Sequence, residues 1–485
     1  MAARYLTFHN ATFDLAFYAR MAWGLSGNDF WEPLVDAHVF GLHLSPILVP
    51  LGLLGRLTNT VAVLMVAQSA AIGGTGLVLG RLGKRWLGPH GGWLGVLALV
   101  AHPNALHAAT YEVHPGTMAL LPMAWALERL DAQDRRGVVL ACLGVLACRE
   151  DLALVTACIG ALAFGFDRRL GAGVMAGSLA YLAYFLVVLF PAHAPDTGSF
   201  ELHFGKWGAS FGEVFQTWWN EPGTLVAHLA QPRKLSFLPR AILPWALLPL
   251  LAPRWWLPAL PTLAIAQLSD FPTTPDLDSH YLTPALPALA VAALAGLRRL
   301  TEAPAAPVRV AVVVTMAIAV LVAGPLPTDA AFWPDETTRG GRAVVEAVEA
   351  RDASLGMASS FQGADALLAH VAERRKLYRG PPPERGADFV AFDARHRQDW
   401  AHDETLLRTD EEEPLRAWLA RPDHEVVLAA GPYLLLARGG DPRAGLAAPY
   451  FVEREGNVAA EGAAIAACLH VEPARRDGDV IELLL

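Results

Sequence analysis

The chain has 485 residues, of which 54% are hydrophobic and 18% charged, and its formal net charge is −9. Soluble domains carry about 25% charged residues on average, so this chain is poor in the groups that keep a protein surface in water. It has no basic stripe and no interleaving of basic and aromatic residues, which argues against a nucleic-acid partner. Residues 60–127 hold few charges, whereas the chain from Asp329 onward is rich in Arg, Asp and Glu. We therefore expect lipid around the first two-thirds and water around the last third.

Apolar runs recur along the first two-thirds of the chain. A transmembrane helix needs about 20 predominantly apolar residues. We predict about ten spans, at 60–80, 91–108, 115–128, 136–149, 151–166, 171–191, 240–252, 255–269, 281–297 and 308–326. The expected fold class is mainly α, a polytopic bundle of transmembrane helices.

Basic residues gather in alternate short loops between these spans. The loops are marked by Arg81, Lys84, Arg85, Arg129, Arg135, Arg136, Arg168, Arg169, Arg254, Arg298 and Arg299. Since Lys and Arg are enriched in cytoplasmic loops, this set is expected to be cytoplasmic, in the inner membrane of a cell. By parity, the N-terminal segment, the long loop at about 192–239 and the C-terminal part face outward.

The charge distribution predicts three regions. Residues 1–59 form an extracytoplasmic amphipathic or interfacial segment, 60–327 the transmembrane domain, and 328–485 a soluble extracytoplasmic domain. Because the outward N-terminal segment has no span before it, either a first transmembrane helix lies upstream of Met1 or the N-terminus crosses the membrane without an anchor, and we favour the first.

The C-terminal region alternates helical and strand patterns. Residues Gly341–Ala350 and Gly363–Glu373 have helical spacing, and Ala387–Phe392 and Glu425–Leu436 read as strands, the second interrupted at Gly431. A small α/β domain fits this pattern.

Ionisable residues close to apolar runs are the first candidates for function, since an Arg or Asp at mid-membrane costs about 2.5–3.5 kcal/mol. Asp14 lies in a short amphipathic pattern over residues 12–18, where it could serve as a catalytic group or cap the helix. His43 precedes an apolar run that ends near Leu54, too short to span, and it could be a functional or an interfacial histidine.

Two further clusters lie in outward turns. Glu112 and His114 occupy a tight turn between two spans, as a polar site or as ordinary loop polarity. The triplet Arg149, Glu150 and Asp151 interrupts an apolar stretch, so a hairpin with the charges at its outer tip costs less than one continuous helix. The triplet could be a helix cap with an internal ion pair, or part of a polar site.

The fifth cluster is His280 and Tyr281, at the entry to a predicted span. With Arg233, Lys234 and Arg240 it could offer cations and hydrogen bonds to an anionic headgroup; the alternative for the basic trio is interfacial anchoring. The topology places all five clusters on one face of the membrane.

Five of these motifs occur in the order of a known family. Phe13-Asp14-Leu15, His43-Leu44-Ser45-Pro46, Glu112-Val113-His114-Pro115, Arg149-Glu150-Asp151-Leu152 and His280-Tyr281 resemble the motifs of a family of prokaryotic predicted membrane proteins, domain of unknown function 2079. The chain departs from the family pattern where Gly116 replaces the acidic residue after His-Pro and where Arg149 replaces Lys.

That family in turn is distantly similar to the GT-C superfamily of integral membrane glycosyltransferases. The resemblance implies transfer of a sugar from a polyprenyl-phosphate carrier to an acceptor outside, with Asp14 as the catalytic carboxylate. It implies membrane lipids and a lipid-linked sugar donor as partners, no certain cofactor, and a divalent metal as a candidate. Arg149, Arg233 and Lys234 are the candidates for the lipid phosphate. The candidates for substrate or metal contacts are His43, Glu112, His114, Glu150, Asp151, His280 and Tyr281.

Two other classes of function stay open: a transporter or lipid flippase, and a non-catalytic envelope assembly protein. A transporter predicts charges at the bilayer midplane, discontinuous helices and internal repeats. The sequence shows no convincing repeat, and its charges group at one interface.

Overall fold

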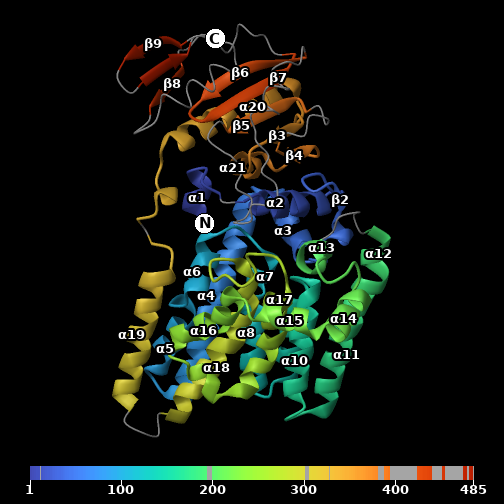
Figure 1. Cartoon of the computed structure of the whole chain (residues 1–485), viewed down its shortest axis with the longest axis vertical. Helices are drawn as coiled ribbons and strands as arrows, with labels where there is room; N and C mark the ends of the chain where they lie inside the picture. The colour runs from blue at the N-terminus through green and yellow to red at the C-terminus, as the bar shows by residue number, and fades with distance from the viewer. Residues whose placement is uncertain are drawn as a thin grey trace. The chain divides into compact units, whose positions relative to one another are not determined.

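The computed structural model describes residues 1–10, 12–193, 199–300, 305–326, 328–380, 387–393 and 423–439, and the strand residues 450–453, 473–477 and 480–483. In these residues the protein is mainly helical, with a small mixed sheet near the C-terminus, as the sequence predicts (Figure 1). The chain divides into two compact units. We call residues 21–31 and 37–327 the transmembrane unit, and residues 1–20, 32–36 and 328–485 the C-terminal unit.

Helices of varied length make up the transmembrane unit. They are the end of α2 (Asp14–Leu25), α3 (Leu48–Gly55), α4 (Thr60–Leu87), α5 (Gly91–Val100), α6 (Pro103–Thr110), α7 (Pro115–Met118), α8 (Leu120–Asp131), α9 (Arg135–Leu146), α10 (Ala153–Ala163), α11 (Arg168–Tyr184), α12 (Phe190–His193), α13 (Ser199–Phe204), α14 (Phe211–Asn220), α15 (Pro222–Leu229), α16 (Pro232–Ile242), α17 (Leu260–Leu268), α18 (Leu286–Leu300) and α19 (Ala305–Ala323). Among the residues that the structure describes, three helical stretches, Thr60–Leu87, Arg168–His193 and His280–Leu300, are long and apolar enough to cross a membrane.

Several expected spans are broken into shorter helices. The predicted span 91–108 consists of α5 and α6, which are separated by a turn at Ala101 and His102. The chain turns at Arg149 between α9 and α10, so the predicted turn between two helices is confirmed, and its place on the outer side stays a prediction.

The prediction of a transmembrane helix at 240–252 is wrong. After α16 the chain forms two short 3-10 turns, η4 (Leu243–Trp245) and η5 (Leu248–Leu251), and Ala246 and Leu247 between them have left-handed backbone. Pro244 and Pro249 at the starts of these turns cannot donate backbone hydrogen bonds, which a continuous helix would need. The apolar composition is real, but the prolines prevent one helix.

The C-terminal unit contains α1 (Ala2–Leu6), the start of α2, α20 (Glu336–Leu355), α21 (Asp365–Leu368) and a five-stranded sheet. The sheet order is β4 (Leu377–Arg379), β3 (Phe361–Gly363), β5 (Phe389–Asp393), β7 (Tyr433–Arg438), β6 (His424–Ala430). Strand β3 runs parallel to β4 and β5, and β7 runs antiparallel to β5 and β6. A second sheet has the order β8 (Tyr450–Glu453), β10 (Val480–Leu483), β9 (Pro473–Asp477).

These elements bear out most of the predicted α/β pattern. The helix predicted at 341–350 lies within α20, which begins with a capping box formed by Asp335 and Thr338. The interrupted strand pattern is the β6–β7 hairpin, which turns at Gly431 with φ of 53°. Of the helix predicted at 363–373, only short helical turns from Asp365 onward form, because Gly363 ends β3.

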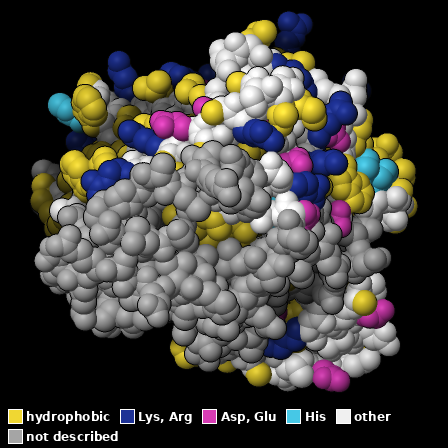
Figure 2. Space-filling view, turned by 90° about the horizontal axis from the view of Figure 1, so that it is seen from above, with side chains coloured by type: hydrophobic (Ala, Val, Ile, Leu, Met, Phe, Trp, Pro, Cys, Tyr) yellow, Lys and Arg dark blue, Asp and Glu magenta, His cyan; other side chains and the backbone are white. Residues whose placement is uncertain are grey.

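Charged residues lie on the outer face of α20, where Arg339, Arg342 and Glu346 are exposed. Figure 2 shows basic and acidic side chains mixed on the described part of the face seen from above. Such a mixture is typical of a surface in water.

Candidate functional site

The turn that carries Glu112 and His114 is fixed by a buried side chain of α4. The amide nitrogen of Gln68 donates hydrogen bonds to the carbonyl oxygens of Ala108 (3.0 Å) and Glu112 (3.1 Å). Its amide oxygen accepts a hydrogen bond of 2.8 Å from the backbone N–H of His114. Gln68 is fully buried, so it satisfies three backbone groups that the turn leaves without helical partners. Nothing in the sequence pattern marks Gln68 as part of a site.

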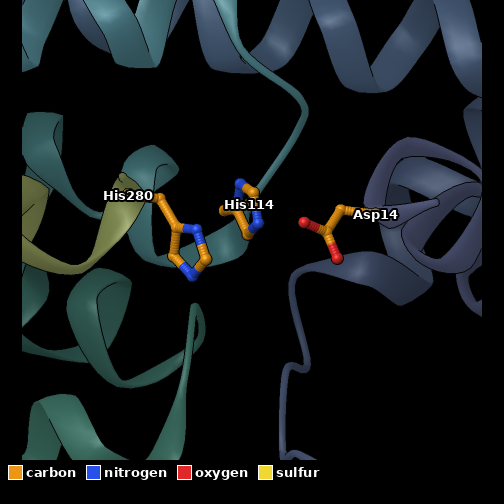
Figure 3. A group of neighbouring side chains, drawn as sticks. All are labelled: Asp14, His114 and His280. Atoms are coloured by element: carbon orange, nitrogen blue, oxygen red, sulfur yellow. The ribbon is translucent and has the colours of Figure 1, made fainter. Parts of the chain in front are cut away.

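His114 stacks on His280, which opens the stretch leading into α18. The ring centroids are 3.6 Å apart and the planes differ by 15°. The ring nitrogens closest to one another lie within 4.8 Å, so the pair offers two nitrogen ligands to a divalent metal ion. Figure 3 draws the two imidazoles of this pair as sticks.

The charged turn between α9 and α10 makes one ion pair and one contact with a histidine. The guanidinium of Arg149 donates two hydrogen bonds of 2.6 Å to the carboxylate of Asp151, in the planar arrangement that suits this pair. Glu150 points elsewhere. Its two oxygens lie 2.9 Å from His43 Nδ1 and 2.9 Å from the backbone nitrogen of Leu44. The turn therefore connects directly to the predicted His43 motif.

Arg149 also lies beside two other motifs. A Cβ built on Gly116, just after the His114 turn, would be 3.9 Å from Arg149 Nη1 and 3.8 Å from Pro284. Pro284 lies in the 3-10 turn that begins at His280. Residues of four predicted clusters are thus neighbours in the transmembrane unit, although the first and the last of these clusters lie more than two hundred residues apart in the sequence.

His203 of α13 is a further member, which lies outside the five clusters predicted from the sequence. Its Nδ1 lies 2.7 Å from the hydroxyl oxygen of Ser269, and its ring makes an edge contact with Tyr281 at a centroid distance of 5.6 Å. Burial lowers the pKa of His203 to about 4, and the positive charges of Arg149 and His43 add to the shift. A single histidine in a long loop gives no spacing signal that would have found it.

The basic residues of α16 hold the loop that follows α17. Lys234 is buried and donates hydrogen bonds to the carbonyl oxygens of Ala266 (2.8 Å) and Ser269 (2.7 Å). Burial lowers the pKa of Lys234 to about 8, and the charge of Arg233 contributes. Arg233 donates to the carbonyl oxygen of Pro272 and, at 3.2 Å, to the carboxylate of Asp276.

Arg240 contacts the same loop, since its guanidinium donates a 3.3 Å hydrogen bond to the carbonyl oxygen of Pro275. All three basic residues thus have partners within the transmembrane unit. Their expected role at a lipid phosphate stays a prediction.

Asp14 is the first residue of α2 and belongs to the C-terminal unit. The hydroxyl of Thr12 donates a 2.9 Å hydrogen bond to its carboxylate and accepts a 3.3 Å hydrogen bond from its backbone N–H. A carboxylate at a helix N-terminus is stabilised by the helix dipole. This position is compatible with both roles that the sequence left open, a helix-capping residue and a reactive group.

Comparison with known proteins gives a family and two crystal structures of one protein. Crystal structures of ArnT from Cupriavidus metallidurans resemble the chain at 13% sequence identity. The apo structure has a TM-score of 0.47 and covers 92% of this chain and 97% of ArnT. The structure bound to undecaprenyl phosphate has a TM-score of 0.42 and covers 99% of this chain and 96% of ArnT. At this sequence identity and these TM-scores, the likeness says nothing about the activity of this chain.

Among proteins of curated function, none matches the chain. The family described as "Predicted membrane protein (DUF2079)" matches residues 4–334, which is more than half of the sequence. The membership that the motifs indicated is confirmed: the chain belongs to this family of predicted membrane proteins.

Proposed function

We propose that the protein transfers a sugar from a polyprenyl-phosphate carrier to an acceptor on the outer face of the cytoplasmic membrane. The observation that carries the proposal is the cluster around Arg149 in the transmembrane unit. There the carboxylate of Glu150 contacts His43, and the carboxylate of Asp151 accepts a hydrogen bond from Arg149. Gly116 of the His114 motif lies next to Arg149. Ionisable groups are expensive among apolar helices, and their retention together favours a functional site.

The chemistry requires one base and one cationic site. Asp14 takes the proton from the acceptor hydroxyl as the oxygen of that hydroxyl attacks the anomeric carbon of the sugar. The bond between that carbon and the phosphate oxygen breaks, and the electron pair leaves with the polyprenyl phosphate. Arg149 stabilises the negative charge that develops on this phosphate, with Arg233 and Lys234 as further cations.

The remaining residues bind and orient. Glu150 fixes the His43 imidazole through its Nδ1 atom, which sets the direction of the ring. The stacked His114 and His280 present nitrogen atoms to the substrate or to a divalent metal, and Glu112 and Tyr281 are expected beside them. Asp151 holds the Arg149 guanidinium in a fixed plane until the phosphate arrives.

The test uses the full chain in lipid nanodiscs with a panel of polyprenyl-phosphate sugars, and it measures release of polyprenyl phosphate. We expect turnover of at least one donor, and a fall of about 10²–10⁴-fold for Asp14→Asn, because general-base catalysis contributes that much. The matched control is Asp36→Asn, since Asp36 is an exposed acidic residue of the same unit. Full turnover by Asp14→Asn would remove the catalytic base from the proposal.

A second measurement separates binding from chemistry. Undecaprenyl phosphate binding to the nanodisc protein is expected to weaken at least several-fold in Arg149→Lys, because Lys cannot reproduce a planar two-point contact. Glu150→Gln is expected to lower turnover while binding persists. Movement of the lipid phosphate across the bilayer without consumption of any donor would instead favour the flippase.

A further inference from the structure

The N-terminal segment that carries Asp14 is built into the C-terminal unit, although more than three hundred residues separate the two in sequence. The hydroxyl of Thr7 donates a 2.8 Å hydrogen bond to the carbonyl oxygen of Ala331, and Thr338 returns a 3.1 Å bond to the carbonyl oxygen of Thr7. His9 Nε2 lies 3.3 Å from the carboxylate of Asp335. These contacts attach the segment just before Asp14 to the start of α20.

Aromatic packing strengthens the same attachment. The imidazole of His370 stacks with Tyr5 at a centroid distance of 4.1 Å and with Phe8 at 3.8 Å. Phe8 packs so closely on α20 that a Cβ on Gly341 would be 2.4 Å from its ring. Only glycine at position 341 leaves room for this ring.

Two further contacts enclose the first turns of α2. The guanidinium carbon of Arg379, the last residue of β4, lies 4.1 Å from the centroid of the Phe13 ring. After two more turns of helix, the fully buried Arg20 donates a 3.3 Å hydrogen bond to the carbonyl oxygen of Arg375. Asp14 therefore lies between Phe13 and Arg20, and both of these residues contact the chain at or just before β4.

Arg379 is itself fixed in place. It donates hydrogen bonds of 2.8 and 3.0 Å to the two carboxylate oxygens of Asp365 in α21. This bidentate pair sets the plane of the guanidinium, and the plane packs against Phe13. Asp14 follows Phe13 directly, so the position of the Phe13 ring determines where the Asp14 backbone begins its helix.

We propose that the C-terminal unit holds Asp14 in its working position and that Arg379 is the positioning residue, supported by Asp365. The inference rests on the proposed function, since Asp14 is the base only there. In this proposal the C-terminal α/β domain takes part in the reaction by orienting the Asp14 carboxylate, and it does not contact the substrate.

The test measures position and reaction separately on the full chain in nanodiscs. In Arg379→Gln we expect hydrogen exchange of residues 12–20 to become about fivefold faster, because the contact with Phe13 is lost. Turnover is expected to fall through kcat with KM little changed, because substrate binding does not involve Arg379. Arg379→Lys keeps the charge and is expected to restore part of both values.

Two controls keep the result interpretable. Phe13→Leu removes the ring but leaves the pair between Arg379 and Asp365, so it is expected to reproduce the faster exchange without disturbing the sheet. Arg339→Gln changes an exposed arginine of α20 whose carboxylate partner is Glu336, and it is expected to leave exchange at 12–20 unchanged. Exchange in β5 and β7 reports whether the domain remains folded.

The outcomes for the two proposals are distinct. Unchanged exchange at residues 12–20 in both Arg379→Gln and Phe13→Leu overturns the positioning role, whatever the activity. Faster exchange together with full turnover by Asp14→Asn keeps the structural role of Arg379 but removes the catalytic base from the proposed function.

Discussion

His370 shows how a single buried side chain makes part of this protein sensitive to pH. The imidazole is enclosed by Tyr5 and Phe8, and its buried Nε2 atom has no hydrogen-bond partner among the residues that the structure describes. Burial lowers the pKa of His370 to about 3, although a hydrogen bond with the backbone of Tyr5 opposes the shift. The folded state therefore keeps this ring neutral at pH values where an exposed histidine is already protonated.

The sign of the resulting pH dependence follows from proton binding. Between the ordinary histidine pKa of about 6.5 and the folded pKa of about 3, the unfolded chain binds more protons than the folded chain, so stability falls as the pH falls. Lowering the pH from 7 to 5 should cost the attachment of the N-terminal segment about 2 kcal/mol through this residue.

Hydrogen exchange of residues 1–9 at both pH values, corrected for the intrinsic effect of pH, measures this loss of stability. His370→Phe keeps an aromatic ring in the stack and is expected to remove most of the dependence. His90→Gln changes an exposed histidine and should behave as the parent protein does. An equal pH response in the parent and in His370→Phe would contradict the assignment.

Elements were predictable from the sequence where charge or turn chemistry interrupts an apolar pattern. The turn at Arg149 and the hairpin at Gly431 are of this kind. Hydropathy alone failed over 240–252, because it does not register that Pro244 and Pro249 break a helix.

The site was less predictable than the elements. Five clusters stood out as polar residues near apolar runs, but Gln68 and His203 did not. Gln68 reads as one polar residue within a long helix, and only the structure shows that it holds the His114 turn. His203 reaches Ser269 and Tyr281 through a loop whose path depends on tertiary packing, and no spacing in the sequence records that.

The pairing of α4 with α5 depends on glycines that let the two backbones approach closely. A Cβ on Gly83 would lie 2.3 Å from the carbonyl oxygen of Gly91, and a Cβ on Gly95 would lie 2.1 Å from that of Leu79. In lipid, helices associate through such close packing, because no hydrophobic driving force acts between them. The seam therefore supports α4, whose Gln68 holds the candidate site.

Gly95→Ala is expected to destabilise the transmembrane unit by about 1–3 kcal/mol, because the methyl group must push a backbone carbonyl away. Thermal unfolding in detergent measures the loss. Gly73→Ala is the matched control in α4, since a Cβ there meets nothing within 4 Å and alanine favours helix. If both variants melt alike, the glycine seam does not support the pairing.

At the scale of the whole transmembrane unit, polar groups gather at the two ends of α4. Gln68 holds the candidate site near one end, and Arg81 lies about 20 Å further along the helix at 1.5 Å per residue. Arg81 donates hydrogen bonds of 3.2 and 3.0 Å to the buried carboxylate of Glu128, and Arg85 pairs with Asp131 at 2.9 Å. The Arg-rich end and the candidate site are therefore on opposite sides of the unit.

This separation makes the orientation in the membrane testable. If the Arg-rich loops face the cytoplasm, as the positive-inside rule predicts, the candidate site faces outward, where a lipid-linked donor would be used. Single cysteines at the exposed positions Arg136, Glu221 and Arg339 sample an Arg-rich loop, the long loop and the C-terminal unit. The four native cysteines are replaced in this background.

A membrane-impermeant maleimide applied to intact spheroplasts is expected to label Glu221→Cys and Arg339→Cys and to leave Arg136→Cys unmodified until the membrane is permeabilised. Labelling of all three after permeabilisation is the control for accessibility. The reverse pattern would place the cluster around Arg149 on the cytoplasmic side. A transferase there would have to take its sugar from a cytoplasmic donor, so the outward reaction proposed for Asp14 would be untenable.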